Sequence, residues 1–362
     1  CSRSNKHKYF FIKDMTLFTN IKSFDKSFLL KLWLSLILYQ LSVCPVSAQK
    51  DTMDIKDYIL IINTYTESFP WSNRLISTAT NFVKDDPKLA VYTEHMNMIM
   101  IDNDSILDQF KDSLFDRYGS HRPRMLLLLG NSSLILKDDL RKMWGDIPMV
   151  LCAGKDYTGP EHYYLTKQPI PLSERVPLAE LSQSCNLTYL YANLYIHENV
   201  EMMFRTLPRM KRFIYVGDER FVNQVNSQEI QEILRTKHPD VHYTFLSSRD
   251  IKKTNQLIDS LNFVDPRTTG ILFSSWFHKR QFAGNMMLTM ILPEIVSTVS
   301  PPIFALNMIE LNDKESGMVG GYTYDQNHFN EKLSNMFSEI LSGKSPRDLP
   351  HYLPTDGTPL IN

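Results

Sequence analysis

The chain has 362 residues and a formal net charge of −1, from 39 basic and 40 acidic side chains. This balance leaves no electrostatic footprint for nucleic acid, so nucleic-acid binding is not expected. Removing the first 48 of the 362 residues as a signal would leave 314, which exceeds the usual size of a single core and indicates two lobes.

The N-terminal part has the order of a secretory signal peptide. Three lysines, at positions 22, 26 and 31, precede an apolar stretch at residues 32–43. That stretch is too short for a comfortable membrane span but suits a signal-peptide core. Small residues at 46–48 then predict cleavage after Ala48 and export, with Met15 as a plausible start.

Other interpretations of this segment stay open. It could form a buried helix or an uncleaved anchor, and residues 41–44 approximate a lipobox ending at Cys44, although Val43 is larger than usual there. After cleavage at Ala48 only Cys152 and Cys185 remain, too few for a disulfide scaffold. Their spacing fits one bond or two separate buried thiols equally well. No second run of membrane length follows.

Strands alternate with amphipathic helices along the mature chain, which predicts an α/β fold with parallel sheets. Between Ala153 and Asn186 the pattern lapses into a proline-bearing loop of the kind that is often functional or mobile. We expect strands at 58–63, 89–93, 125–129, 148–152, 187–191, 211–216, 241–246, 270–273 and 302–306, and helices at 72–84, 105–118, 136–144, 197–207, 223–237, 251–261 and 282–299.

Each predicted strand ends in short polar residues, and ligands bind beyond the carboxyl ends of parallel strands. The first loop mixes hydroxyls with aromatic rings, which suits a small-molecule cleft. Arg249 could clamp a carboxylate, and the Asn131–Ser133 stretch at a helix start favours an anion. The predicted ligand-binding residues are Thr64, Tyr65, Thr66, Trp71, Asn131, Ser132, Asp218, Ser248, Arg249, Ser275, Trp276, Asn307 and Tyr322.

Simpler roles are available for several of these residues. Trp71 fits an aromatic plug, Asn131 and Ser132 fit helix capping, Arg249 fits a surface ion pair, and Trp276 fits lobe packing. Catalytic motifs are missing: the chain has no GxSxG elbow, no phosphate loop, no HExxH and no paired CxxC. We therefore expect a binding protein rather than an enzyme, with no cofactor and no metal.

The closing segment carries a family resemblance. Gly320–Gly321 precedes an apolar helical pattern ending near Leu341, and Gly343-Lys344-Ser345-Pro346 follows. This arrangement resembles the ABC-type substrate-binding-protein-like family, periplasmic binding proteins of type I. The resemblance implies two doubly wound parallel-sheet lobes with a central ligand cleft and a Gly-Gly strand that crosses back to the first lobe. It places that lobe at 55–198 plus 318–345 and the second at 199–317.

The opening Asp57–Tyr65 and the ending Pro354–Asn362 look like the periplasmic sensor region of Bacteroides-type two-component histidine kinases. This implies a periplasmic or otherwise extracytoplasmic sensor domain in signal transduction, with residues 346–362 leading toward a membrane segment and kinase in a longer parent. The alternative is a free solute-binding component of an ABC importer. Expected partners are a small organic ligand (sugar, amino acid or carboxylate) and a membrane kinase or permease; a homodimer is left open.

Overall fold

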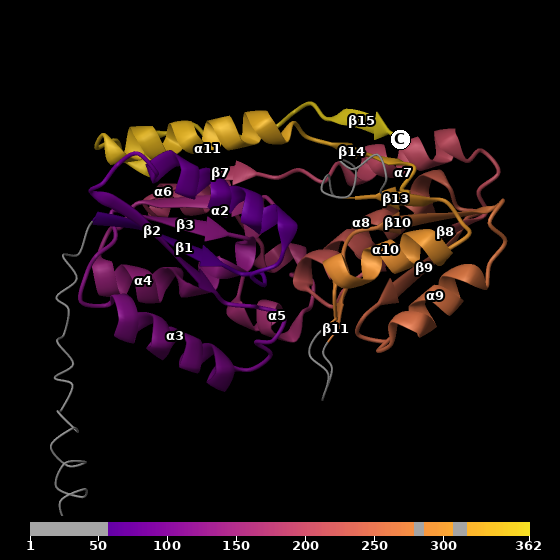
Figure 1. Cartoon of the computed structure of the whole chain (residues 1–362), viewed down its shortest axis with the longest axis horizontal. Coiled ribbons are helices and arrows are strands. Elements are labelled where there is room, and N and C mark those ends of the chain that lie inside the picture. Colours follow the sequence, from indigo (N-terminus) through magenta and orange to yellow (C-terminus); the bar gives the residue numbers. More distant parts are fainter. Residues whose placement is uncertain (1–56, 279–285, 307–316) are drawn as a thin grey trace, which may run out of the picture. The chain divides into compact units, whose positions relative to one another are not determined.

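The computed structural model describes residues 57–278, 286–306 and 317–362. The predicted signal segment and Asn307 lie outside these residues. All described elements belong to one compact unit, Lys56–Asn362, and they form two α/β lobes, each built on its own sheet (Figure 1). No helix within the described ranges is long and apolar enough to cross a membrane.

The first lobe is built on a parallel sheet in the order β2-β1-β3-β4-β7. Its central strands are continuous apolar runs because helices cover both faces. In β1, Leu60 and Ile62 pack on one face while Ile59 and Ile61 pack on the other. The strands are β1 (Asp57–Asn63), β2 (Leu89–His95), β3 (Met125–Leu129), β4 (Met149–Ala153) and β7 (Leu187–Tyr191).

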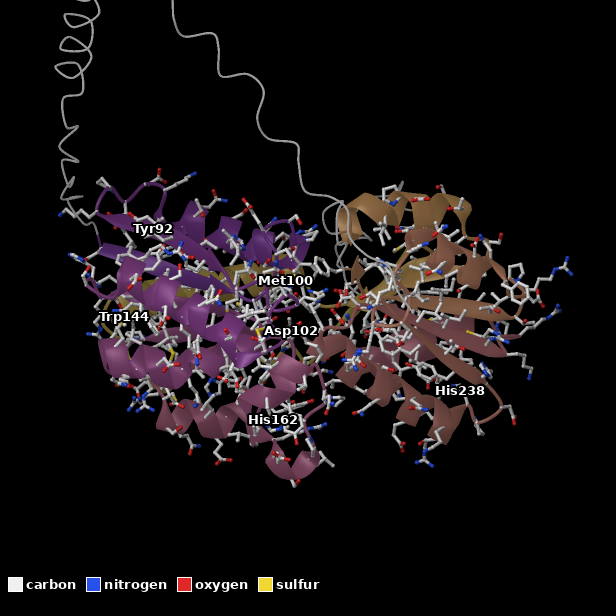
Figure 2. The ribbon with its side chains drawn as sticks, turned by 90° about the horizontal axis from the view of Figure 1, so that it is seen from below. Tyr92, Met100, Asp102, Trp144, His162 and His238 are labelled. Carbon is white, nitrogen blue, oxygen red and sulfur yellow. The ribbon has the colours of Figure 1, made fainter. Side chains whose placement is uncertain are left out.

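Helices cover the two faces of this sheet in separate layers. One layer contains α3 (Asp104–Tyr118), α4 (Lys137–Trp144) and α6 (Leu178–Ser184). The opposite layer pairs α2 (Pro70–Val83) with α11 (Gln326–Leu341), which returns from the far end of the chain. Figure 2 shows Tyr92 and Trp144 within this lobe and His238 on the other.

The second lobe is built on a six-stranded sheet in the order β15-β14-β13-β10-β8-β9, in which β15 is the antiparallel strand. Helices α7 (Ile196–Thr206) and α8 (Phe221–Lys237) pack on one face, while α9 (Thr254–Asn262) and α10 (Leu288–Thr298) cover the other. The strands are β8 (Arg212–Gly217), β9 (His242–Ser247), β10 (Thr269–Phe273), β13 (Ile303–Ala305), β14 (Gly320–Thr323) and β15 (Thr358–Ile361).

The proline-bearing stretch between Ala153 and Asn186 is more regular than its sequence indicates. It forms a two-stranded hairpin and two short helices ahead of β7. These are β5 (Tyr157–Thr158), α5 (Glu161–Thr166), the 3-10 turn η2 (Leu172–Glu174), β6 (Val176–Pro177) and α6. The remaining short elements are η1 (Asn131–Leu136), η4 (Pro346–Asp348), β11 (Phe277–His278) and β12 (Met286–Met287).

The family resemblance implies that the Gly320–Gly321 strand crosses to the first lobe, but this is wrong, because the strand belongs to the second sheet. It pairs with β13 and β15 in the second sheet, and the chain returns to the first lobe only at α11. A Cβ added to Gly320 would lie 2.3 Å from the carbonyl oxygen of Leu360. The glycine therefore permits the close pairing with β15. Helix α7, which the sequence predicts to lead out of the first lobe, packs in the core of the second.

Three chain passages connect the lobes: residues 192–195, residues 324–325 and residues 349–357. Asn199 holds the first passage to β14, because its amide donates to the carbonyls of Leu194 (3.0 Å) and Tyr322 (2.9 Å) and accepts from the Tyr322 N–H (2.7 Å). The Tyr195 hydroxyl donates to the carbonyl of Pro354 over 3.2 Å. The three passages are thus bonded to one another or to the strand beside them.

Cys152 and Cys185 are both free and buried. Burial raises the pKa of the Cys152 thiol well above its usual range, which makes this thiol unreactive. The open choice between one disulfide and two separate thiols is therefore resolved as two separate thiols.

Candidate functional site

Buried polar side chains hold the loop after β1 in place through hydrogen bonds. Asn63, fully buried at the strand end, accepts from the N–H of Tyr65 (3.1 Å) and donates to the hydroxyl of Ser72 (3.2 Å). The Thr64 hydroxyl donates to the carbonyl of Leu129 on the neighbouring strand over 2.8 Å. These bonds hold the loop in one conformation, so the side chains above it are positioned in advance.

Three aromatic rings form a platform on this loop. Tyr65 stacks on Phe69 with centroids 4.4 Å apart and an interplanar angle of 10°. Trp71 meets the edge of Tyr65 at 5.5 Å and 72°. The platform offers a flat apolar surface with a phenol hydroxyl at one end. Burial is the main cause of the raised pKa of Tyr65, so this hydroxyl stays protonated.

The facing surface of the second lobe is organised around Asp218, which follows β8 and is fully buried. Arg220 donates to its two carboxylate oxygens, through Nε (2.8 Å) and Nη2 (2.6 Å). Asn223 (2.8 Å) and the Ser275 hydroxyl (2.9 Å) donate to the same carboxylate. Burial lowers the pKa of Arg220, but the Asp218 charge, the hydrogen bonds to that carboxylate and the nearby Tyr65 and Tyr215 together raise it above its usual value. The guanidinium is therefore held in place and charged.

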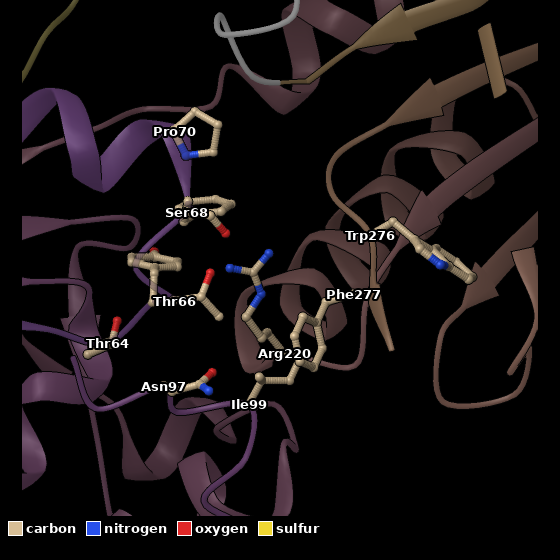
Figure 3. A pocket seen from close by; sticks show the side chains of 11 residues that line it. Thr64, Thr66, Ser68, Pro70, Asn97, Ile99, Arg220, Trp276 and Phe277 are labelled. Carbon is tan, nitrogen blue, oxygen red and sulfur yellow. The ribbon is translucent and has the colours of Figure 1, made fainter. Parts of the chain in front are cut away.

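Arg220 reaches across to the platform of the first lobe. Its guanidinium carbon lies 4.7 Å from the ring centroid of Phe69 and 5.3 Å from that of Tyr65, within the range of a cation–π interaction. In Figure 3 the guanidinium points toward Thr66 and Ser68. The contact joins the first βα loop of one lobe to the start of α8 in the other.

Three small cavities of about 30, 60 and 40 Å³ adjoin this contact, and Tyr65 and Arg220 line all of them. We call them the first, second and third chambers. The first also borders Asn97, Ile99 and Phe277; the second, Trp71, Asn193, Asn223, Asn226 and Ser275; the third, Ser132, Lys155 and Lys167. Every charged residue that borders them within the described chain is a cation.

Two amide oxygens at this site have unmet hydrogen-bonding capacity. Asn97 Oδ1 and Asn226 Oδ1 are buried and have no hydrogen-bond partner in the described part of the chain. Asn97 borders the first chamber, and Asn226, itself fully buried, borders the second. A buried acceptor without a donor costs free energy, so both positions favour a bound molecule that brings hydroxyl or amino hydrogens.

No protein-family model matches the chain, and no curated protein matches it significantly in sequence. Solved structures do match in fold. An ABC domain in complex with L-Trp from Streptococcus pneumonia is 11% identical, with a TM-score of 0.55 over 85% of this chain and 92% of its own. A carbohydrate-transporter solute-binding protein from Agrobacterium radiobacter, in complex with D-arabinose, is 9% identical, with a TM-score of 0.53 over 85% and 95%.

The fructose-binding periplasmic domain of a Bacteroides hybrid two-component system is 12% identical, with a TM-score of 0.53 over 84% of this chain and 90% of its own. The chain has the two-lobe fold of type I periplasmic binding proteins. In the present binding-protein fold, the chambers lie where the strand ends of both lobes meet. The predicted residues that border them are Thr64, Tyr65, Thr66, Trp71, Asn131, Ser132, Ser275 and Trp276, and the predicted Asp218 accepts hydrogen bonds from Arg220.

Asn131 borders the third chamber, but all the hydrogen-bonding capacity of its side chain is used within the protein. Its amide donates to the carbonyls of Lys155 and Tyr157 (both 2.8 Å) and accepts from the N–H groups of Gly154 (2.9 Å) and Lys155 (3.1 Å). An asparagine has two donors and two strong acceptor sites, so no capacity is left for a ligand. Asn131 instead fixes the loop after β4, and Ser132 is the neighbour that faces the chamber.

Trp276 is part of the core of the second lobe. Its side chain is 1% exposed and packs among residues of β8, β10 and α9. Figure 3 shows its ring pointing away from the other labelled residues of the first chamber, whereas Phe277, next in the chain, lies beside Ile99. Both residues border the first chamber, and the assignment of Trp276 to ligand binding stays a prediction.

The other predicted residues lie apart from the chambers or outside the described chain. Ser248 is buried, and its hydroxyl accepts from the Glu219 N–H over 3.2 Å. Arg249 is exposed and donates to the carbonyl of Lys167 over 3.4 Å. Tyr322 packs edge-on against Tyr195 next to the passages between the lobes. Asn307 lies outside the described residues.

Sequence reasoning missed Arg220, which, like Tyr65, borders all three chambers. The signal was present, because Arg220 stands two positions after an acidic residue at a strand end and at the start of a helix. Asn97 was also missed. Its positive φ of 49° marks an unusual turn, which no residue pattern in the sequence indicates. No group of three or more His, Cys, Asp or Glu in the described ranges could hold a metal ion.

Proposed function

We propose that this chain is an extracytoplasmic receptor that binds a small organic ligand between its two lobes. The observation that carries the proposal is that Tyr65, from the first lobe, and Arg220, from the second, border the same three chambers. A molecule bound there touches both lobes at once. Such a ligand favours one lobe arrangement over others, which is the requirement for a binding event to become a signal.

The ligand class we propose is a sugar or a similar hydroxyl-bearing molecule with one flat apolar face. The Tyr65 and Phe69 rings supply stacking area. The side-chain oxygens of Asn97 and Asn226, which have no hydrogen-bond partner in the described part of the chain, favour a ligand with hydrogen-bond donors. The cations at the chamber walls disfavour a positively charged ligand. The arabinose complex and the fructose-binding domain among the similar folds support this choice. Amino acids and carboxylates are the competing classes.

For the biological role, we propose the sensor region of a two-component histidine kinase that signals by lobe closure. The similar fold of a periplasmic two-component domain supports this role, as does the sequence resemblance of both chain ends. A free solute-binding component of an ABC importer is the second candidate, supported by the carbohydrate-transporter protein. The genomic sequence after the Asn362 codon distinguishes them: a hydrophobic span and kinase indicate the sensor, and a stop codon beside permease genes indicates the importer.

The test is a thermal-shift screen of sugars, amino acids and carboxylates on the purified chain. A ligand present at about 100 times its Kd stabilises the folded state by about 2.7 kcal/mol, which raises the melting temperature measurably. Titration calorimetry then gives a stoichiometry near one. The proposal fails if no compound shifts the melting temperature, or if a compound that does so binds equally well to the Tyr65→Ala and Arg220→Ala proteins.

A further inference from the structure

The lobes touch along one face of α8 as well as at the connecting passages. Phe221, Val225 and Glu229 are spaced four residues apart, which places them on the same side of the helix over about two turns. All three contact or face the first lobe, although α8 belongs to the second. The helix therefore has two packed sides, one within its own lobe and one against the other lobe.

The apolar part of this face is buried in the first lobe. Phe221 (8% exposed) and Val225 (6%) belong to the same buried cluster as Tyr157 and Tyr164 of the first lobe. The rings of Phe221 and Tyr164 lie 4.8 Å apart. Separating the lobes would expose these side chains to water, which opposes opening.

Polar contacts flank the apolar part at both ends. At the far end, Lys155 of the first lobe pairs with Glu229 over 3.1 Å, and the Lys155 side chain is only 7% exposed. At the start of the helix, Arg220 lies against the Tyr65 and Phe69 rings. The result is one continuous interface that runs from the chambers along α8.

The chambers themselves show what this interface does to the cleft. Because Arg220 and Tyr65 border all three cavities, the pair divides the space between the lobes into small volumes of about 30 to 60 Å³. A cavity needs on the order of 10–15 Å³ by this measure to hold one water molecule, so each chamber holds a few waters at most. A larger molecule needs the Arg220 side chain to shift.

We propose that α8 is a built-in clasp: Arg220, Phe221, Val225 and Glu229 hold the lobes together through contacts that the protein makes with itself. Closure then has a source independent of any ligand, and a ligand that enters at Arg220 shifts an existing equilibrium between open and closed lobes further toward the closed state. The clasp does not rest on the proposed function, whereas entry at Arg220 does.

The test measures the distance between the lobes in single molecules. Donor and acceptor dyes are attached at Asp112→Cys on α3 and Asp259→Cys on α9, both exposed, in a chain with serine at positions 1 and 44. The remaining Cys152 and Cys185 are buried. The protein is unfolded, dialysed and refolded to remove any co-purified small molecule. We expect the closed population to dominate after this treatment.

Variants of the helix face then separate the clasp from general stability. Glu229→Lys places two cations together and is expected to lower the closed-to-open ratio several-fold; Phe221→Ala and Arg220→Ala lower it at least about tenfold. Glu232→Lys is the matched control, because Glu232 is exposed and pairs with Arg235 on its own helix. Glu229 is 46% exposed, so its variant tests the clasp without threatening the fold.

Three results would overturn the clasp. These are an open population that dominates in the refolded protein, a closed-to-open ratio that Glu229→Lys and Phe221→Ala leave unchanged, and an equal effect of Glu232→Lys. Ligand affinity is measured separately by calorimetry, so a failed clasp and a failed binding proposal give different results. Binding with an open unliganded protein refutes the clasp alone, and closure without binding of any compound refutes the binding proposal alone.

Discussion

Trp71 donates its indole N–H to the hydroxyl of Tyr324 over 2.9 Å, although 253 residues separate them in sequence. Trp71 stands at the start of α2 beside the aromatic platform, and Tyr324 stands in the second passage between the lobes. Burial raises the pKa of Tyr324, so its hydroxyl stays protonated and also donates to Gln326 over 3.3 Å. The bond thus joins the aromatic platform to the second passage between the lobes.

This bond should be measurable as a coupling energy. Trp71→Phe keeps an aromatic ring but removes the N–H, and Tyr324→Phe removes the hydroxyl. A double-mutant cycle in chemical denaturation should give a coupling of about 0.5–1.5 kcal/mol, the range of a single protein hydrogen bond. Additive single effects would show that the contact stabilises nothing and that the two rings are held independently.

Tyr65→Ala should weaken ligand binding by roughly 2 kcal/mol or more while the fold stays intact, because the ring borders every chamber and belongs to no sheet core. Calorimetry with the ligand from the screen measures the loss. Tyr163→Ala is a matched control, since Tyr163 pairs with Glu174 away from the chambers. Lys237→Ala, on the far end of α8, should likewise leave affinity unchanged; comparable weakening in either control would refute the site.

Trp276→Ala should act on stability, in contrast to Tyr65→Ala. Removing a tryptophan side chain that is 1% exposed leaves a large cavity, and such losses cost about 3–5 kcal/mol of unfolding free energy. Urea denaturation gives the value directly. Phe263→Ala is the control, because Phe263 is 92% exposed and its loss should cost within about 0.5 kcal/mol. A stable Trp276→Ala protein with weakened binding would return Trp276 to the ligand site.

Because of the partly buried position of His351, we expect the free energy of unfolding to fall when the pH is lowered. His351 stacks on Tyr189 at 4.2 Å in the third passage, and burial lowers its pKa below the usual value of about 6.5. The unfolded chain therefore binds the proton more readily, so the stabilising contribution is present above about pH 6.5 and is lost as pH falls through the lower folded-state pKa. Denaturation curves between pH 7.5 and 4.5 should show this loss, and His351→Gln should reduce it. An identical pH profile in the variant would refute the assignment.

The strands were predictable because buried parallel strands are continuous apolar runs. Met125–Leu129 and Leu187–Tyr191 begin and end where the sequence predicts, and Pro148–Cys152 is displaced by one residue. Burial on both faces leaves few ambiguous positions in such segments. The elements between Ala153 and Asn186 were not predicted because they are short, with helices of only 6 and 7 residues. Each helix buries only a few apolar residues, such as Tyr164 and Leu178, which is too few for a clear period.

The site was predictable only at the level of loops. The polar strand ends indicated Tyr65, Thr66 and Ser275, and the structure places these three residues at the chambers. Whether a side chain faces a ligand or serves the protein depends on partners far away in sequence. Asn131 is saturated by the loop after β4, and Arg220 gains its role from rings about 150 positions earlier in the chain. The local sequence pattern cannot indicate contact partners that lie so far away in the chain.

The path of the chain after Met318 has a consequence for how the protein reaches its native state. Strand β14 joins the second sheet, α11 covers the first, and β15 then completes the edge of the second. The first lobe thus lacks helix α11, and the second lobe lacks two strands of its sheet, until residues 320–361 are in place. Contacts this distant in sequence slow folding, because a long loop must close before they form. We expect the two lobes to fold as one kinetic unit, with neither forming a stable independent intermediate ahead of the other.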